Sequence, residues 1–336
     1  MKTALNKSRN AFLLARRRQI LVLIFCLISV TLSGLRNPDS EIIGVDTPTY
    51  RYTYNELERT SWYDLINNFS YYSVEYEGRE KGYDFFVKFT QIFIDNFRFF
   101  MFLTAAFFII PVGMIIYRYV KSYEGLILSF TIYFALFTSI PNGLMRQAIT
   151  LGVFLLATKY VETREWIKFY VIIALLFTIH NSIVIAIPFF FMYKHCTSKK
   201  YLLIALIAAP VLVAVSSTLM YRILAGTVYE LYGESDGFGL VNILLLIGAI
   251  SLLTYFYFDK VKKIEGSNFL ICGVIGTLFC LPFIRLGGTV LRISYYYFVF
   301  FIPLLPVLID CACKDRVIRW LAYLFSISFF LFFIFR

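Results

Sequence analysis

Residues 167–193 read IKFYVIIALLFTIHNSIVIAIPFFFMY, and the path of this stretch decides the topology of the whole chain. It is apolar almost throughout, and it exceeds the roughly 20 residues that one helix needs to cross a bilayer. Its centre, however, carries the polar residues His180, Asn181 and Ser182. The stretch is therefore either one tilted membrane helix or two short helices that meet at this polar trio and fold back.

The distribution of basic residues favours the fold-back path. Lysine and arginine concentrate in the cytoplasmic loops of membrane proteins. Because the path of 167–193 sets the side on which every later loop lies, the basic residues of those loops distinguish one crossing from a fold-back. Basic clusters occur at 194–200, 260–263 and 314–319, and all three fall inside only if the stretch folds back. We therefore expect a cytoplasmic N-terminus and an outward-facing hairpin tip. Because non-helical backbone at membrane depth must be buried in protein or line a wet cavity, His180 is expected to line such a cavity.

The rest of the chain has the composition of a membrane protein. Hydrophobic residues make up 60% and charged residues 16% of its 336 positions, against roughly 45–50% and 25% in soluble domains. We expect an all-α polytopic membrane protein with about ten or eleven transmembrane helices. The net charge of +11 comes from short clusters between apolar runs, so nucleic-acid binding is not expected. The other apolar runs are 20–35, 98–117, 124–140, 144–160, 201–219, 241–258, 268–284, 294–310 and 317–335.

The apolar runs divide the chain into four parts. A basic cytoplasmic N-terminus, 1–19, precedes the first membrane helix, 20–35, which lacks a clear signal-peptidase site and is expected to stay uncleaved. A polar extracytoplasmic loop follows at 36–97, and a multi-helix membrane domain with the hairpin occupies 98–336. The tyrosines of the loop suit stacking on sugar rings and its acids suit hydrogen bonding to them, but a partly ordered loop at the membrane interface explains both equally well.

Several polar residues lie in or beside the membrane runs, at the face that is expected to be outside. Ionisable residues there are costly and point to function. Arg146 and Gln147 begin one apolar run, and Arg285 and Arg292 flank the segment RLGGTVLR. Arginine offers a planar donor fork for phosphates, and His180 is the natural general base near neutral pH. An arginine that only snorkels to the interface is the structural alternative for Arg146.

Five short motifs occur in order along the chain, and together they resemble a known family. They are D-x-x-x-Y (Asp46, Tyr50), E-x-G-Y (Glu80, Tyr83), R-Q (Arg146, Gln147), H-x-S (His180, Ser182) and R-x-x-x-Y (Arg292, Tyr296). Their order and spacing resemble the EpsG family of Wzy-like polymerases of bacterial exopolysaccharide, capsule and O-antigen repeat units. One departure is that R-Q is followed here by A-I, where the family often has I-A or F-A.

The resemblance implies a glycosyl transfer at the outer face of the bacterial cytoplasmic (inner) membrane. The substrates would be undecaprenyl-pyrophosphate-linked oligosaccharides and the growing polysaccharide, with membrane lipid, a chain-length regulator and a flippase as further partners. The leaving group would be a lipid pyrophosphate, so no cofactor or metal is expected, and arginines would neutralise its charge. The candidate catalytic residues are His180, Asp46 and Glu80. The candidate substrate-binding residues are Arg146, Gln147, Arg285, Arg292, Tyr50, Tyr83, Ser182 and Tyr296.

Other functions use related features. An O-antigen ligase runs the same chemistry with arginine and histidine at the outer face. A lipid-linked sugar flippase or polysaccharide transporter needs charged residues along a path that is reachable from both sides. A membrane O-acetyltransferase is usually reached by its donor from the inside. Because the candidate residues gather at one expected face, the polymerase is favoured.

Overall fold

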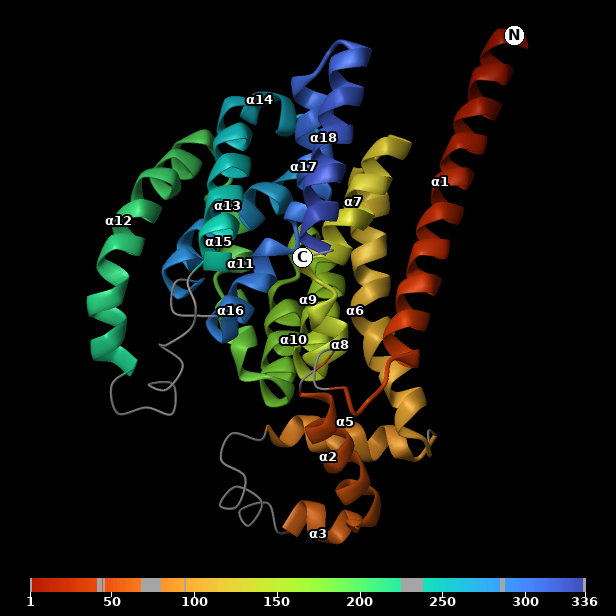
Figure 1. Ribbon diagram of the computed structural model, residues 1–336, viewed down its shortest axis with the longest axis vertical. Coiled ribbons are helices and arrows are strands. Elements are labelled where there is room, and N and C mark those ends of the chain that lie inside the picture. Colours follow the sequence, from red (N-terminus) through yellow and green to blue (C-terminus); the bar gives the residue numbers. More distant parts are fainter. Residues whose placement is uncertain are drawn as a thin grey trace. The chain divides into compact units, whose positions relative to one another are not determined.

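A computed structural model of the chain describes residues 2–40, 44, 46–67, 80–93, 95–224, 238–284 and 288–334 (Figure 1). Within those ranges the regular elements are helices, and no strand occurs. The all-α polytopic class expected from the sequence is confirmed. The chain divides into two compact units, one made of Met1–Tyr160, Ile167–Val184 and Phe330–Arg336, and one made of Val161–Trp166 and Ile185–Phe329.

The first unit is built on long apolar helices that pack closely. α1 (Lys2–Leu35) runs along α6 (Phe97–Tyr119), and Gly113 of α6 leaves room for the side chains of Cys26 and Val22. A side chain at Gly152 would collide with the backbone of Phe107, so this glycine permits a close helix approach. The unit also contains α7 (Tyr123–Leu136), the short α8 (Ser139–Gly143), α9 (Met145–Glu162) and α10 (Trp166–Ile179).

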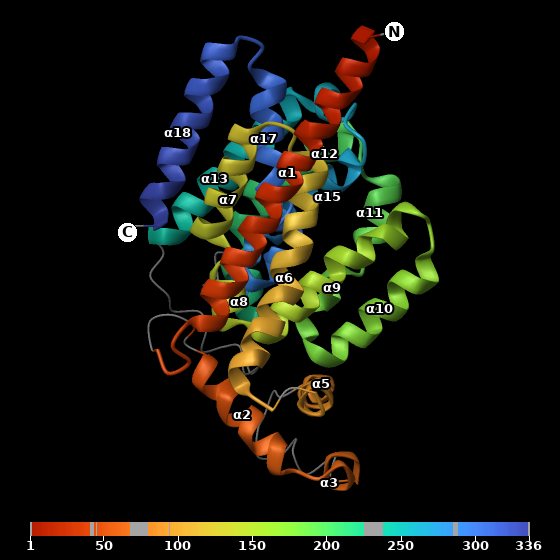
Figure 2. The ribbon, with the colours of Figure 1, turned by 90° about the vertical axis from the view of Figure 1, so that its right-hand side faces the viewer.

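The polar segment between α1 and α6 also folds into helices, which we call the cap layer. It consists of α2 (Thr47–Arg59), α3 (Trp62–Asn67) and α5 (Lys81–Gln91). These helices gather at one end of α1, α6, α9 and α10, and α5 lies across that end, as Figures 1 and 2 show from two directions. The cap layer therefore covers the ends of α9 and α10, where Arg146 and His180 lie.

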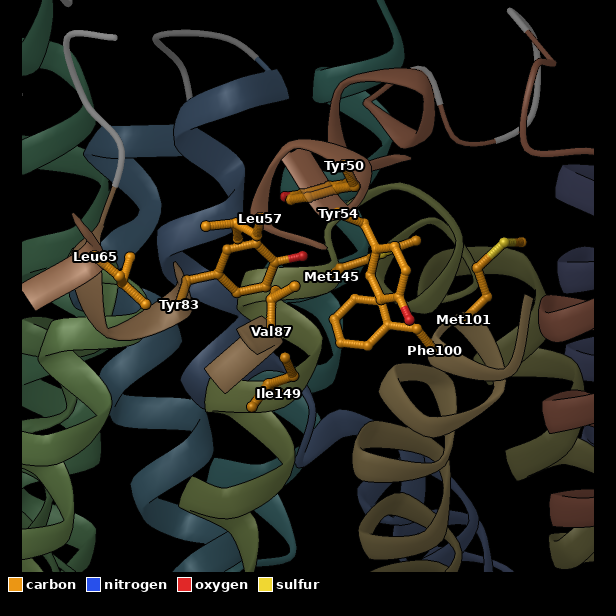
Figure 3. Close-up of a cluster of buried hydrophobic side chains, with 10 residues drawn as sticks. All are labelled: Tyr50, Tyr54, Leu57, Leu65, Tyr83, Val87, Phe100, Met101, Met145 and Ile149. Carbon is orange, nitrogen blue, oxygen red and sulfur yellow. The ribbon is translucent and has the colours of Figure 1, made fainter. Parts of the chain in front are cut away.

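A buried cluster fastens the cap layer to the helix ends beneath it (Figure 3). Tyr50, Tyr54 and Leu57 follow one another along one face of α2, at the three- and four-residue spacing of a helix. Each side chain of this size contributes roughly 1.5–3 kcal/mol when it is fully buried. The other members are Leu65, Tyr83, Val87, Phe100, Met101, Met145 and Ile149.

Polar contacts hold both ends of α2. The Lys88 ammonium of α5 donates to the Leu57 carbonyl at 2.8 Å and so satisfies one of the free carbonyls at the end of α2. At the start of α2, the Thr47 hydroxyl donates to the Asn142 carbonyl of α8 at 2.9 Å. Gly44 has a φ of +82° and lies directly against the same carbonyl, a conformation and a proximity that only glycine tolerates.

The second unit is organised around α15. This helix packs against α12, α13 and α16, and its Gly273 and Gly276 make room for the Phe300 and Tyr297 rings. The Tyr297 hydroxyl donates to the Ile185 carbonyl at 2.8 Å. The helices of this unit are α11 (Phe189–His195), α12 (Lys199–Leu224), α13 (Phe238–Phe256), α14 (Phe258–Val261), α15 (Ser267–Ile284), α16 (Gly288–Phe298), α17 (Phe301–Ala312) and α18 (Arg316–Ile334), of which α18 belongs to it as far as Phe329.

The helices coincide with the apolar runs, but many are short. Among the described residues, four helical stretches are long and apolar enough to cross a membrane: Leu13–Leu35, Phe97–Tyr119, Tyr123–Gly143 and Arg316–Ile334. A fifth span results if Arg292–Phe298 and Phe301–Ala312, bent by 41°, count as one. Three further apolar helices, Trp166–Ile179, Asn242–Phe256 and Ser267–Leu281, are shorter, and α9 carries several charges. The chain is thus a multi-pass membrane protein, and the total of ten or eleven spans stays a prediction.

The stretch 167–193 is broken at its polar centre. α10 ends at Ile179, His180 lies outside any helix, and Asn181–Ala186 form a short 3-10 helix, η1, before α11 begins. One continuous tilted helix is therefore ruled out for this stretch. The fold-back of its two halves through the membrane remains a prediction.

A pair of reporter fusions tests the fold-back path. We expect a reporter fused after Lys200 to read cytoplasmic, and one fused near Ser235 to read extracytoplasmic, because the basic clusters then stay inside. Alkaline phosphatase and green fluorescent protein fusions at both positions measure this directly. A reversed pair would refute the fold-back topology and, with it, the argument that the candidate residues share one face of the membrane.

Candidate active site

Glu80 lies at the centre of the candidate site and joins two of the residues singled out from the sequence. It stands just before α5, and its side chain is only 8% exposed. One carboxylate oxygen, Oε2, forms an ion pair with Nη1 of Arg146 on α9. The other, Oε1, lies 2.9 Å from Nδ1 of His180 and accepts a longer hydrogen bond, 3.4 Å, from the Asn181 backbone. The carboxylate thus bridges the start of α9 and the end of α10.

The electrostatics of this trio keep Glu80 ionised. Burial alone would raise the pKa of Glu80, but the hydrogen bond with His180 and the charge of Arg146 outweigh it and hold the pKa below its ordinary 4.5. Since the pKa is lower in the folded than in the unfolded chain, the ionised carboxylate stabilises the fold above about pH 4.5. That contribution is lost as the pH falls through the folded-state pKa. An ionised carboxylate with both oxygens engaged is a weak general base.

Two tyrosines of the cap layer pack against the guanidinium of Arg146. Its guanidinium carbon lies 5.7 Å from the ring centre of Tyr50 and 6.0 Å from that of Tyr83, within the range of cation–π attraction. The two rings meet edge to face at 5.8 Å, side by side in Figure 3. Both tyrosines are buried, whereas 29% of the Arg146 side chain and 23% of the His180 side chain remain exposed. Arg146 and His180 are therefore accessible to a ligand, whereas Tyr50 and Tyr83 are not.

A glycine brings Glu80 to His180. Gly82 lies in the first turn of α5 and packs directly on Thr178 in the last turn of α10, two residues before His180. A Cβ at this position would collide with the Thr178 side chain and would lie 2.6 Å from its carbonyl oxygen. This contact gives the glycine of the E-x-G-Y motif a physical role that sequence reasoning did not assign to it.

We expect Gly82→Ala to separate Glu80 from His180 and to reduce activity strongly. The added methyl group meets the Thr178 backbone as well as its side chain, so α5 and α10 must move apart, and misplacement of about 1 Å in a catalytic group costs on the order of 100-fold. Gly248→Ala on α13 is the matched control, because nothing lies within 4 Å of a Cβ there. Polymer yield at equal protein level measures the effect. Equal yields from both variants would refute the role given to Gly82.

The other candidate residues lie around this centre or apart from it. Gln147 is buried beside Arg146, and the Thr150 hydroxyl bonds to the carbonyls of both residues at 3.1 Å. Asp46 precedes α2, one turn before Tyr50, and Ser182 is half-buried in η1. Arg292 and the fully buried Tyr296 lie one turn apart on α16, in the second unit. Arg285 lies outside the described residues.

The structure therefore brings together residues of four of the five motifs. Tyr50, Glu80, Tyr83, Arg146 and His180 come from α2, the start of α5, α9 and the end of α10, and they converge on one carboxylate and one guanidinium. An accessible guanidinium beside an accessible imidazole suits an anionic ligand whose reaction requires a proton to be removed.

Comparisons with known proteins agree with the motifs. A family model described as the EpsG family matches residues 19–336, which is nearly the whole chain. Among curated proteins and among solved structures, no match was found. On the family model, the chain belongs to the EpsG family, a family of Wzy-like polysaccharide polymerases.

Proposed function

We propose that this chain polymerises oligosaccharide repeat units carried on undecaprenyl pyrophosphate, at the outer face of the bacterial cytoplasmic membrane. Membership of a polysaccharide polymerase family supports the reaction class. The observation that carries the proposal is the Glu80 carboxylate, which holds an accessible arginine and an accessible histidine side by side. The three residues divide the tasks of leaving-group binding, proton removal and positioning.

Arg146 binds the pyrophosphate of the donor. A guanidinium has five N–H donors, so its contacts with Glu80 and Tyr50 leave other donors for phosphate oxygens. As the bond between the anomeric carbon and the pyrophosphate oxygen breaks, negative charge grows on the leaving group, and a fixed cation there lowers the barrier. The buried Tyr50 and Tyr83 act on the substrate through Arg146, which they hold in place.

His180 removes the proton of the acceptor sugar. With Nδ1–H donated to Oε1 of Glu80, the lone pair on Nε2 is free to accept a proton. The acceptor hydroxyl oxygen forms the new bond to the anomeric carbon, its proton passes to Nε2, and undecaprenyl pyrophosphate departs with the electron pair of the broken bond. Glu80 acts here as a positioning residue, because it fixes the tautomer and stabilises the imidazolium that forms.

Gene deletion with analysis of surface glycan size tests the function. We expect the polymer to disappear while single repeat units remain attached, and purified protein in nanodiscs to release undecaprenyl pyrophosphate from lipid-linked repeats. Polymer that is still made but no longer attached to its final acceptor would instead identify a ligase. Lipid-linked repeats that accumulate on the inner leaflet would identify a flippase.

A further inference from the structure

A cavity of about 330 Å³ opens along α2, one helical turn beyond the residue that touches Arg146. Tyr50 contacts Arg146, and Tyr54, four residues later, lines the cavity. One turn of helix advances by roughly 5–6 Å, so the cavity and the candidate active site are neighbours along the same element. The volume lies at the lower end of the range for small-molecule sites, roughly 300–1,000 Å³.

The lining of the cavity suits sugars. Of its lining residues, Tyr54 and Met101 are buried, and the half-buried Phe97 ring lies 5.5 Å from the Tyr54 ring. Around them stand the carboxylates of Glu58 and Asp95, together with the amides of Asn55 and Asn96. Carboxylates accept hydrogen bonds from hydroxyl groups, and amides both donate and accept, which matches the alternating hydroxyls of a pyranose.

The same lining disfavours a phosphate. Arg51 and Arg98 balance the charges of Glu58 and Asp95, so the cavity has no net positive charge. Arg51 is also held by both oxygens of Asp39, at 2.8 and 2.9 Å. By contrast, the side chain of Asn55 is exposed and has no partner among the described residues. The Asn96 oxygen accepts from the Arg98 backbone at 2.8 Å, so the Asn55 amide and the carboxylates of Glu58 and Asp95 are the groups that offer hydrogen bonds to hydroxyls, beside the exposed Arg98.

We infer that this cavity is a glycan subsite, which binds sugar residues of the acceptor or the growing chain beyond the two that react. The inference rests on the proposed function, since a polymerase of oligosaccharide repeats must hold more sugars than the reacting pair. α2 links the two sites, because Tyr50 faces Arg146 and the next turn carries Tyr54, Asn55 and Glu58 into the cavity. A glycan bound there stays in register with Arg146 and His180.

The double variant Asn55→Ala/Glu58→Gln tests the subsite with purified full-length protein in nanodiscs. The probe is an oligosaccharide mixture from partial acid hydrolysis of the polysaccharide of the strain that carries the gene. We expect the variant to bind it about tenfold more weakly than the wild type, as the loss of one or two hydrogen bonds predicts. In cells the same variant should make shorter chains, and longer fragments should lose more affinity than single repeats if the growing chain is the occupant.

Two controls separate loss of the subsite from other causes. Arg59→Gln changes an exposed charged residue of α2 that does not line the cavity, and it should match the wild type. Inorganic pyrophosphate, the probe for Arg146, should bind the wild type and the double variant equally, which shows that the variant is folded. If the double variant does not fold, Asn55→Ala alone replaces it, since alanine favours the helix.

The outcomes distinguish the subsite from the function on which it rests. A wild-type protein that forms polymer, together with a folded variant of unchanged oligosaccharide affinity and chain length, would overturn the subsite alone. Oligosaccharide that fails to bind the wild type at all would also overturn it. A wild type that neither forms polymer nor releases undecaprenyl pyrophosphate would overturn the proposed function.

Discussion

Arg146→Ala is expected to abolish polymer formation while the protein still accumulates. The guanidinium is the accessible cation of the candidate site, and removal of one group that stabilises transition-state charge typically costs about 100- to 1,000-fold in rate. Glu80 keeps its contact with His180 in this variant, and Thr47 keeps its hydrogen bond to the Asn142 carbonyl, so the cap layer stays attached to the helices beneath it. Surface glycan size and the rate of undecaprenyl pyrophosphate release measure the loss.

Lysine at the same position should restore only part of the activity. A lysine ammonium supplies the charge but cannot reproduce the planar fork that grips two phosphate oxygens, nor the stacking against Tyr50 and Tyr83. Arg59→Ala, an exposed arginine of the cap layer, is the control and should leave polymer yield unchanged. Full activity of Arg146→Ala would remove the pyrophosphate-binding role.

His180→Ala and His180→Gln are expected to lower the rate by about 100- to 10,000-fold, the usual contribution of a general base. Binding of the donor should change little, because Arg146 remains in place. The turnover number should therefore fall while the KM for lipid-linked donor stays close to that of the wild type. Both parameters, measured in nanodiscs at matched protein concentration, test the assignment.

Glu80→Gln separates positioning from catalysis. The amide preserves the shape of the side chain, but it accepts through one atom and donates through the other, so it no longer selects the Nδ1–H tautomer of His180. We expect a smaller loss than in the His180 variants, together with a change in the pH profile of turnover. Asp46→Asn is the decisive comparison: normal polymer from both His180 variants and none from Asp46→Asn would move the base to Asp46.

The sequence by itself determined the membrane class and most of the helices. Long apolar runs fix membrane helices locally, because backbone hydrogen bonds must be satisfied within each segment in lipid. The distribution of basic residues favoured a path that folds back within 167–193, and the polar trio at its centre indicated where the two halves would meet. Arg146 and His180 could be singled out in advance because ionisable residues are rare in such runs.

The tertiary structure alone decided what the polar segment 36–97 does. Its tyrosines suggested stacking on sugars, yet Tyr50, Tyr54 and Tyr83 are buried in the cluster of Figure 3. A tyrosine fits both an exposed sugar platform and a buried core, because it is amphipathic. Only the apolar ends of α6 and α9, which lie far away in the sequence, settle which face of α2 is covered.

Nothing in the sequence around Glu80 indicated that its carboxylate joins Arg146 to His180. Glu80 is 66 positions from Arg146 and 100 from His180, so their contacts depend on how α5 crosses the ends of α9 and α10. Sequence reasoning offered Glu80 and His180 as separate catalytic candidates, whereas the structure joins them. That pairing exists because Gly82 lets α5 pack against Thr178, and a long-range contact of this kind is fixed by packing rather than by the identity of either residue.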